Sequence, residues 1–162
     1  MNFADTNWLA AAYLEPRADD TEAIKRREIV DRFMRRQGGQ LMVSQIVLLE
    51  ARNIFSRVTG EREPQEWQRL EADFDGRLYV DPMNWDILRR ECEALFSKYA
   101  WSAALGTFDT AIVASVKLAG GTRFLSFDAM AKALAAAEGI EVYPPLAGSE
   151  KQVVSCLKRK AG

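Results

Sequence analysis

Short apolar runs alternate with longer amphipathic stretches along this chain. The runs that we predict to be strands cover residues 2–4, 41–43, 78–80, 124–126 and 140–143. The runs are short and mostly apolar, and polar, glycine or proline residues bound them. Such runs are typical of strands buried on both faces, as in a parallel sheet that helices cover.

Helices are predicted between these strands. The best-defined one runs from Gln45 to about Thr59, because Ser44 is a good N-cap and Gly60 a good terminator. Its predicted core-facing stripe consists of Val47, Ala51, Ile54, Phe55 and Val58. The other predicted helices cover 8–14, a charged stretch opening at Thr21, 64–74, 85–99, 108–119 with Thr107 as its cap, and 129–137.

This order of strands and helices predicts an α/β fold with a mostly parallel central sheet and helices on both faces. No linker, low-complexity tract or internal repeat divides the 162 residues. A chain of this length is one ordinary domain with a substantial core.

Charge and composition narrow the chemistry. The chain has no histidine, which excludes Ser-His-Asp and Cys-His catalysis and histidine-ligated zinc. Its net charge of −1 means that any nucleic acid would have to be held by a local basic surface or a bridging metal. Cys92 and Cys156 show no metal-ligand spacing, and no apolar run is long enough to cross a bilayer. With an acid where a signal peptide has a basic region, we expect a reduced, cytoplasmic protein.

Four separated acids are the candidate site. Asp5 and Asp128 follow predicted strands, where sites form in open α/β sheets. Asp109 lies in the first turn of a predicted helix, and Glu50 stands in an otherwise apolar stretch. Each has an alternative structural explanation: Asp5 and Asp128 as N-caps or turn formers, Asp109 as a helix-dipole partner, and Glu50 as the polar margin of its helix. Brought together, such carboxylates suit Mg²⁺ or Mn²⁺.

The residues around these acids resemble the motifs of PIN-domain nucleases, and among these most of all the VapC-type toxins of bacterial toxin–antitoxin pairs. The motifs lie at 3–7, 44–50, 108–114 and 120–128, in family order, and 140–145 resembles the usual last strand. Ser126 stands where threonine is commoner in the family, which keeps the hydroxyl. The resemblance covers residues 1–145 as a nuclease domain and leaves 146–162 as a C-terminal tail.

The resemblance implies roles for individual residues. Asp5, Glu50, Asp109 and Asp128 would be both catalytic and metal-binding, around one or two Mg²⁺ or Mn²⁺ ions. Thr6, Asn7 and Ser126 would support them by orienting metal-bound water, although turn hydroxyls and, for Asn7, a helix N-cap explain them equally well. Arg57 follows Glu50 by two helical turns and so shares its face; it would contact substrate phosphate, neutralise the acids, or simply be a solvated arginine.

The implied function is that of a metal-dependent endoribonuclease, the toxin of a type II toxin–antitoxin pair. RNA would be its substrate, a VapB-type antitoxin its partner and a homodimer its assembly. Two alternatives remain: a PIN-like binding or scaffold module without catalysis, and a Mg²⁺-dependent phosphatase-type domain. Asn7 stands where the dehalogenase-like phosphatases want a second aspartate, which weakens the phosphatase alternative.

Overall fold

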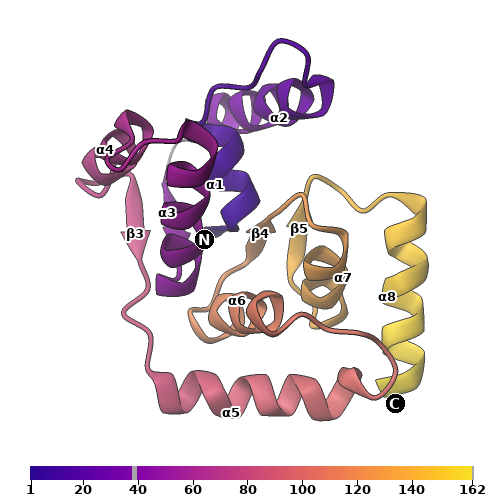
Figure 1. Cartoon of the computed structure of the whole chain (residues 1–162). Helices are drawn as coiled ribbons and strands as arrows, with labels where there is room; N and C mark the ends of the chain where they lie inside the picture. The colour runs from indigo at the N-terminus through magenta and orange to yellow at the C-terminus, as the bar shows by residue number, and fades with distance from the viewer. Residues whose placement is uncertain (38–39, 162) are drawn as a thin grey trace.

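A five-stranded parallel sheet forms the centre of the computed structural model, which describes residues 1–37 and 40–161 (Figure 1). The strands lie in the order β3-β2-β1-β4-β5, and every neighbouring pair is parallel. Their bounds are β1 Asn2–Ala4, β2 Leu41–Val43, β3 Leu78–Val80, β4 Arg123–Leu125 and β5 Glu141–Tyr143. The predicted strands and the α/β class are therefore confirmed, although β4 is shifted by one residue at both ends and β5 begins one residue later than predicted.

Helices fill every connection between the strands. In chain order they are α1 Thr6–Tyr13, α2 Thr21–Gln37, α3 Gln45–Thr59, α4 Gln65–Ala72, α5 Trp85–Leu95, the π-helix η1 Phe96–Ala100, α6 Thr107–Leu118, α7 Ala129–Ala137 and α8 Gly148–Ala161. Ser44 caps α3 by accepting from the Val47 N–H, and Gly60 ends it in the left-handed conformation with φ 73°. Both signals were readable in the sequence because capping is a local interaction.

Two local predictions were wrong. Thr107 is the first residue of α6 rather than its cap; Gly106 is the capping residue and has no side chain to contribute. Val58, predicted to face the core, is 52% exposed, whereas Val47, Ala51 and Phe55 are buried. Val58 lies in the last turn of α3.

Chain order and crossover handedness place the helices. The chain moves from β1 through β2 to β3 on one side and then crosses to β4 and β5 on the other. Because parallel crossovers are right-handed, α1–α4 cover one face of the sheet and α5–α7 the other. Figure 1 agrees: α1 to α4 lie together, while α5 runs beneath α6 and α8 stands beside α7. The strand order thus has its topological switch point between β1 and β4, where successive connections leave in opposite directions. Ligand sites form at such points in open α/β sheets.

An aromatic cluster lies beside the carboxyl ends of β4 and β5. Trp8 is fully buried and stacks on Phe127 with ring centres 5.3 Å apart. Phe33 and Tyr143 pack edge-on against the same indole, with ring centres 5.4 and 5.9 Å away. These rings join α1, α2, the end of β4 and β5, so the backbone around the carboxyl ends of β1 and β4 rests on a packed apolar base.

The C-terminal segment is a helix, for which the sequence analysis predicted no element. Helix α8 packs along α7 and buries Leu157. Lys132 of α7 donates to both carboxylate oxygens of Glu150 in α8 at 3.0 Å, and the two side chains are only 6% and 11% exposed. The Ala147 N–H also donates to Glu150, at 2.6 Å. A nearly buried ion pair therefore fastens residues 148–161 to the helix that Asp128 caps.

A second ionic cluster fixes the opposite end of α7. Glu138 accepts from Lys98 and Lys117 at 2.7 Å and from the Tyr99 hydroxyl at 2.5 Å. Burial works against the charge of Glu138, but the bonds from Lys117, Lys98 and Tyr99 prevail and lower its pKa to about 2. Lys117 also pairs with Glu91 of α5 at 2.6 Å. The cluster ties α5, η1, α6 and α7 into one arrangement and so sets α6, which carries Asp109, against α7.

Candidate metal centre

Asp5 and Ser126 lie at the carboxyl ends of the two adjacent strands β1 and β4. The strands pair in register from Asn2 with Arg123 to Ala4 with Leu125, and the Asp5 N–H donates to the Leu125 carbonyl at 2.9 Å. The Ser126 hydroxyl donates to Asp5 Oδ2 at 2.6 Å, and the Thr6 N–H donates to Oδ1 at 2.7 Å. Asp5 is thus the N-cap of α1 and, at the same time, a buried acid in the centre of the candidate site.

Asn7 bridges the same two strand ends. Its amide nitrogen donates to Asp5 Oδ2 at 2.9 Å, and its carbonyl oxygen accepts from the Phe127 N–H at 2.8 Å. It lies inside α1, so the alternative explanation of Asn7 as an N-cap is wrong. With both polar ends of its side chain engaged, Asn7 holds the Asp5 carboxylate against the chain segment that leads from Ser126 to Asp128.

Thr6 connects Glu50 to this pair of strands. Its hydroxyl donates to Glu50 Oε2 at 2.6 Å, across 44 residues of sequence. Glu50 lies half-buried on α3, so its carboxylate has the partner that its apolar setting demands. Thr6 therefore positions the glutamate relative to Asp5.

Asp109 and Asp128 come from the opposite face of the sheet. Asp128 caps α7 by accepting from the Ala131 N–H at 2.7 Å, as its structural alternative predicted. Asp109 lies in the first turn of α6 and is half-buried. Its carboxylate folds back over Gly106, where the methyl group of an alanine would collide with Asp109 Oδ2. Gly106 is a positioning residue that the sequence analysis missed; a glycine three residues before the acid was the only signal for it.

Electrostatic coupling joins all four acids. Burial first, and then the charges of Asp109 and Glu50, raise the pKa of Asp5 to about 6, although the bonds from Ser126 and Thr6 oppose the rise. The pKa of Asp109 is raised as well, by burial first and then by Asp128 and Glu50. Carboxylates that raise one another's pKa in this way leave a concentration of negative charge that a cation relieves.

The donor set fits a hydrated hard cation. Within residues 1–37 and 40–161, no three acidic or cysteine side chains converge closely enough to ligate one ion directly. Magnesium, however, keeps several waters and is commonly bound through only one or two carboxylates. Four carboxylates with hydroxyl and amide neighbours match that mode, and the absence of histidine and of nearby thiols argues against softer metals.

Arg57 does not join the cluster. It is exposed on α3, and in the described part of the chain no ion pair connects it to Glu50. Its proposed contact with substrate phosphate stays a prediction. The neighbouring Arg52, by contrast, bonds the Ser56 hydroxyl and the Arg62 carbonyl and lies over the Trp67 ring, so it fixes the end of α3.

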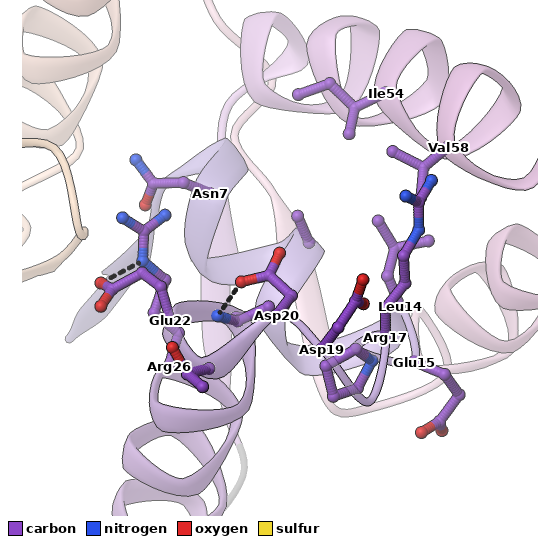
Figure 2. A pocket seen from close by; sticks show the side chains of 15 residues that line it. Asn7, Leu14, Glu15, Arg17, Asp19, Asp20, Glu22, Arg26, Ile54 and Val58 are labelled. Atoms are coloured by element: carbon purple, nitrogen blue, oxygen red, sulfur yellow. Dashed lines mark hydrogen bonds and ion pairs between the residues drawn. The ribbon is translucent and has the colours of Figure 1, made fainter.

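A groove of about 760 Å³ opens beside Asn7 (Figure 2). Helix α1, the loop that follows it, the start of α2 and the end of α3 form its walls. Ile54 and Val58 give it an apolar side, which explains why Val58 is exposed although it belongs to the predicted stripe. The lining also includes the acids Glu15, Asp19, Asp20 and Glu22 together with Arg17 and Arg26.

Comparison with protein-family models shows what this arrangement is. Residues 3–137 match the model of the PIN domain. The chain belongs to the PIN domain family. The match begins in β1 and ends with α7, so it contains Asp5, Glu50, Asp109 and Asp128, and it leaves α8 outside. A comparison with curated protein sequences finds no match.

Solved structures share this PIN fold. Mycobacterium tuberculosis VapC20, a toxin that cleaves the sarcin–ricin loop, is 20% identical with a TM-score of 0.63, covering 82% of this chain and 94% of its own. FitAcB of Neisseria gonorrhoeae is 16% identical with a TM-score of 0.59, covering 90% of this chain and 98% of its own. VapBC2 of Rickettsia felis, bound to a fragment of its promoter DNA, is 13% identical with a TM-score of 0.58, covering 87% and 96%. At these identities the likeness concerns the fold.

The raised pKa of Asp5 predicts that the stability of this PIN domain depends on pH in metal-free buffer. A raised carboxyl pKa means that the folded state holds the proton more tightly than the unfolded state, so stability from this group is lost as pH rises. Raising the pKa from 3.8 to about 6 corresponds to about 3 kcal/mol, lost across this pH window. The asparagine of Asp5→Asn cannot ionise, so the variant does not lose this stability. The free energy of unfolding of the variant minus that of the wild type should therefore rise by about 3 kcal/mol between about pH 4 and about pH 7.5.

Urea denaturation in EDTA at both pH values measures this change. The amide also disturbs the bonds from Ser126 and Asn7, but that cost is the same at both pH values and cancels in the comparison. Repeating the series with Mg²⁺ should shrink the change, since a bound cation stabilises the ionised acid. A stability difference between variant and wild type that does not change with pH would contradict the prediction.

Proposed function

We propose that this protein is a cytoplasmic endoribonuclease that hydrolyses RNA phosphodiester bonds with Mg²⁺ or Mn²⁺. The observation that carries the proposal is the electrostatic coupling of four carboxylates from four separate elements, at the switch point of the strand order between β1 and β4. A phosphodiester is an anion, so a site made of acids can hold one only when a cation bridges them. A nuclease thus accounts for a cluster that would otherwise be unfavourable.

The residues have distinct tasks in this proposal. When bound, the metal would supply an activated water and stabilise charge on the scissile phosphate. Asp5, Glu50, Asp109 and Asp128 would hold it, while Thr6, Ser126 and Asn7 keep the carboxylates of Asp5 and Glu50 in place. The chain has no histidine to act as general base, and this chemistry needs none.

Metal removal tests the activity directly. Purified protein should cut RNA with Mg²⁺ or Mn²⁺, lose the activity in EDTA, and regain it when the metal is restored. Asp5→Ala should stay inactive under all these conditions, and calorimetry should show that it binds the metal more weakly. Cleavage that survives EDTA or the loss of Asp5 would overturn the proposal, because it would come from another site or a contaminant.

A non-catalytic PIN module is the second candidate. The lack of three converging acids in the described residues is the observation that favours it. Calorimetry separates the two: a nuclease binds Mg²⁺ or Mn²⁺ at this site, and a scaffold that has lost the function does not. The match to the PIN family leaves the phosphatase alternative without support.

We also propose that the protein is the toxin of a type II toxin–antitoxin pair. FitAB and VapBC2 were both solved as complexes bound to DNA, and VapC20 is described as a toxin. The groove beside Asn7 offers a VapB-type antitoxin an apolar wall next to an acidic one, which suits an amphipathic segment with basic residues. Expression should arrest growth, co-expression of the cognate VapB-type antitoxin should relieve the arrest, and light scattering should show a homodimer.

None of the helices in residues 1–37 and 40–161 is both long and apolar enough to span a bilayer.

A further inference from the structure

Arg26 is placed beside the acid cluster by a contact that the sequence did not reveal. Its guanidinium carbon lies 5.4 Å from the centre of the Phe127 ring. Phe127 stands between Ser126 and Asp128, and its N–H is bonded to Asn7. The arginine comes from α2, in the basic run at residues 25–27. Stacking on Phe127 brings one member of that run to the edge of the site.

The guanidinium is open to a ligand. Arg26 and Asn7 both line the groove, and the Arg26 side chain is 38% exposed. Figure 2 shows its terminal nitrogens turned away from Glu22 and toward Asn7. Only Nε is engaged in the bond to Glu22, at 3.1 Å. Stacking on a ring also restricts the side chain beforehand, so less conformational entropy is lost when a ligand binds.

The pair with Glu22 is easily exchanged. Glu22 is 66% exposed and lies one helical turn before Arg26. Exposed pairs of this kind contribute little to stability and are screened by salt. A phosphate can accept from both terminal nitrogens of the guanidinium at once, whereas Glu22 accepts from Nε.

Two neighbouring cations are held in other ion pairs. Lys132 is buried against Glu150, and Arg27 pairs with Asp31 and donates to the Leu14 carbonyl. Since the chain carries a net charge of −1 and the site is acidic, bound RNA requires a local positive group besides any metal. Arg26 is a cation that is held against the segment 126–128 and still faces the groove.

We infer that Arg26 binds a backbone phosphate of the RNA substrate next to the phosphate that is cleaved. This inference rests on the proposed ribonuclease function. Its role is substrate binding rather than chemistry, so its loss should raise KM and leave kcat nearly unchanged. The planar, stacked guanidinium matters as well as the charge, so lysine should replace it only in part.

RNA binding measured against salt tests the inference. The protein carries Asp109→Asn to prevent cleavage, and the probe is a fluorescein-labelled, mixed-sequence single-stranded RNA of about 20 nucleotides, titrated between about 50 and 200 mM KCl. Adding Arg26→Met, which keeps an apolar stem on Phe127, should weaken binding by about 10-fold. It should also lower the slope of log affinity against log salt by about 0.7, the value for one phosphate contact on a single strand.

Arg35→Met is the matched control. Arg35 is an exposed arginine of the same helix, on its opposite face and roughly 14 Å further along. It should leave both affinity and slope close to those of the parent. Arg26→Lys should keep the slope while binding several-fold more weakly, a result that a purely structural role for Arg26 would not produce.

The outcomes distinguish a failure of the role of Arg26 from a failure of the ribonuclease proposal. If the wild type cuts RNA but Arg26→Met keeps the parent's salt slope, Arg26 does not contact phosphate, and only this inference is wrong. If the wild type neither cuts nor binds RNA, the ribonuclease proposal fails and this inference falls with it. If Arg26→Met lowers the melting temperature, binding is compared at a temperature where both proteins are folded, and an unchanged salt slope there contradicts this inference.

Discussion

Replacing Lys132 by methionine should destabilise the folded protein by about 3–5 kcal/mol, because it leaves the Glu150 carboxylate nearly buried without a cation. Glu150 would keep only the bond from the Ala147 N–H. Urea or thermal denaturation measures the loss. Lys151→Met is the control: it removes an exposed lysine of the same helix α8 and should cost less than about 0.5 kcal/mol.

The double variant Lys132→Met with Glu150→Leu should regain most of the lost stability. Both groups must leave water to pair, so two packed apolar side chains are often as stable as a buried ion pair. A loss below about 1 kcal/mol in the single variant would show that Glu150 escapes to solvent when its partner is removed. A large loss would make α8 part of the folding unit, although the family match ends at residue 137 and a domain boundary at residue 145 is so far only a prediction.

The Asp109→Asn variant should lose RNA hydrolysis by at least about 100-fold, because it removes one anionic oxygen from the group proposed to hold the metal. In EDTA it should nevertheless be slightly more stable than the wild type. The pKa of Asp109 is raised by burial and by Asp128 and Glu50, so its ionised form is unfavourable at neutral pH. Asp109 is half-exposed, and solvent screening limits this gain to less than about 1 kcal/mol.

Asp86→Asn provides a matched comparison, because Asp86 also lies in the first turn of a helix, α5, and is exposed. It should leave hydrolysis unchanged and cost about 0.3–0.5 kcal/mol, since an acid there stabilises the helix dipole. Activity assays and denaturation in EDTA on both variants test the pair. If Asp109→Asn destabilised the metal-free protein as Asp86→Asn does, Asp109 would be a helix-dipole residue rather than a functional acid. A substitution that abolishes activity and at the same time raises stability is typical of active-site residues.

Much of the architecture followed from short-range signals. The apolar runs before Asp5 and Ser44 predicted β1 and β2 at their observed bounds, and Ser44 and Gly60 predicted both ends of α3. Such signals work because apolar burial, capping and left-handed glycines depend on neighbouring residues. The tail was missed although Val153, Val154 and Leu157 have helical spacing, because its charged character resembled a frayed end.

The sequence alone determined the four acids as candidate site residues, because of their positions after strands and in helices and because the chain has no histidine. Their role as metal ligands is still a prediction. Only the tertiary structure decided that Thr6 bonds Glu50, that Asn7 joins Asp5 to Phe127, and that Gly106 makes room for Asp109. It alone placed Arg26 on Phe127. These contacts join residues from two to more than a hundred positions apart, and most depend on which strand ends lie side by side, which no local pattern records.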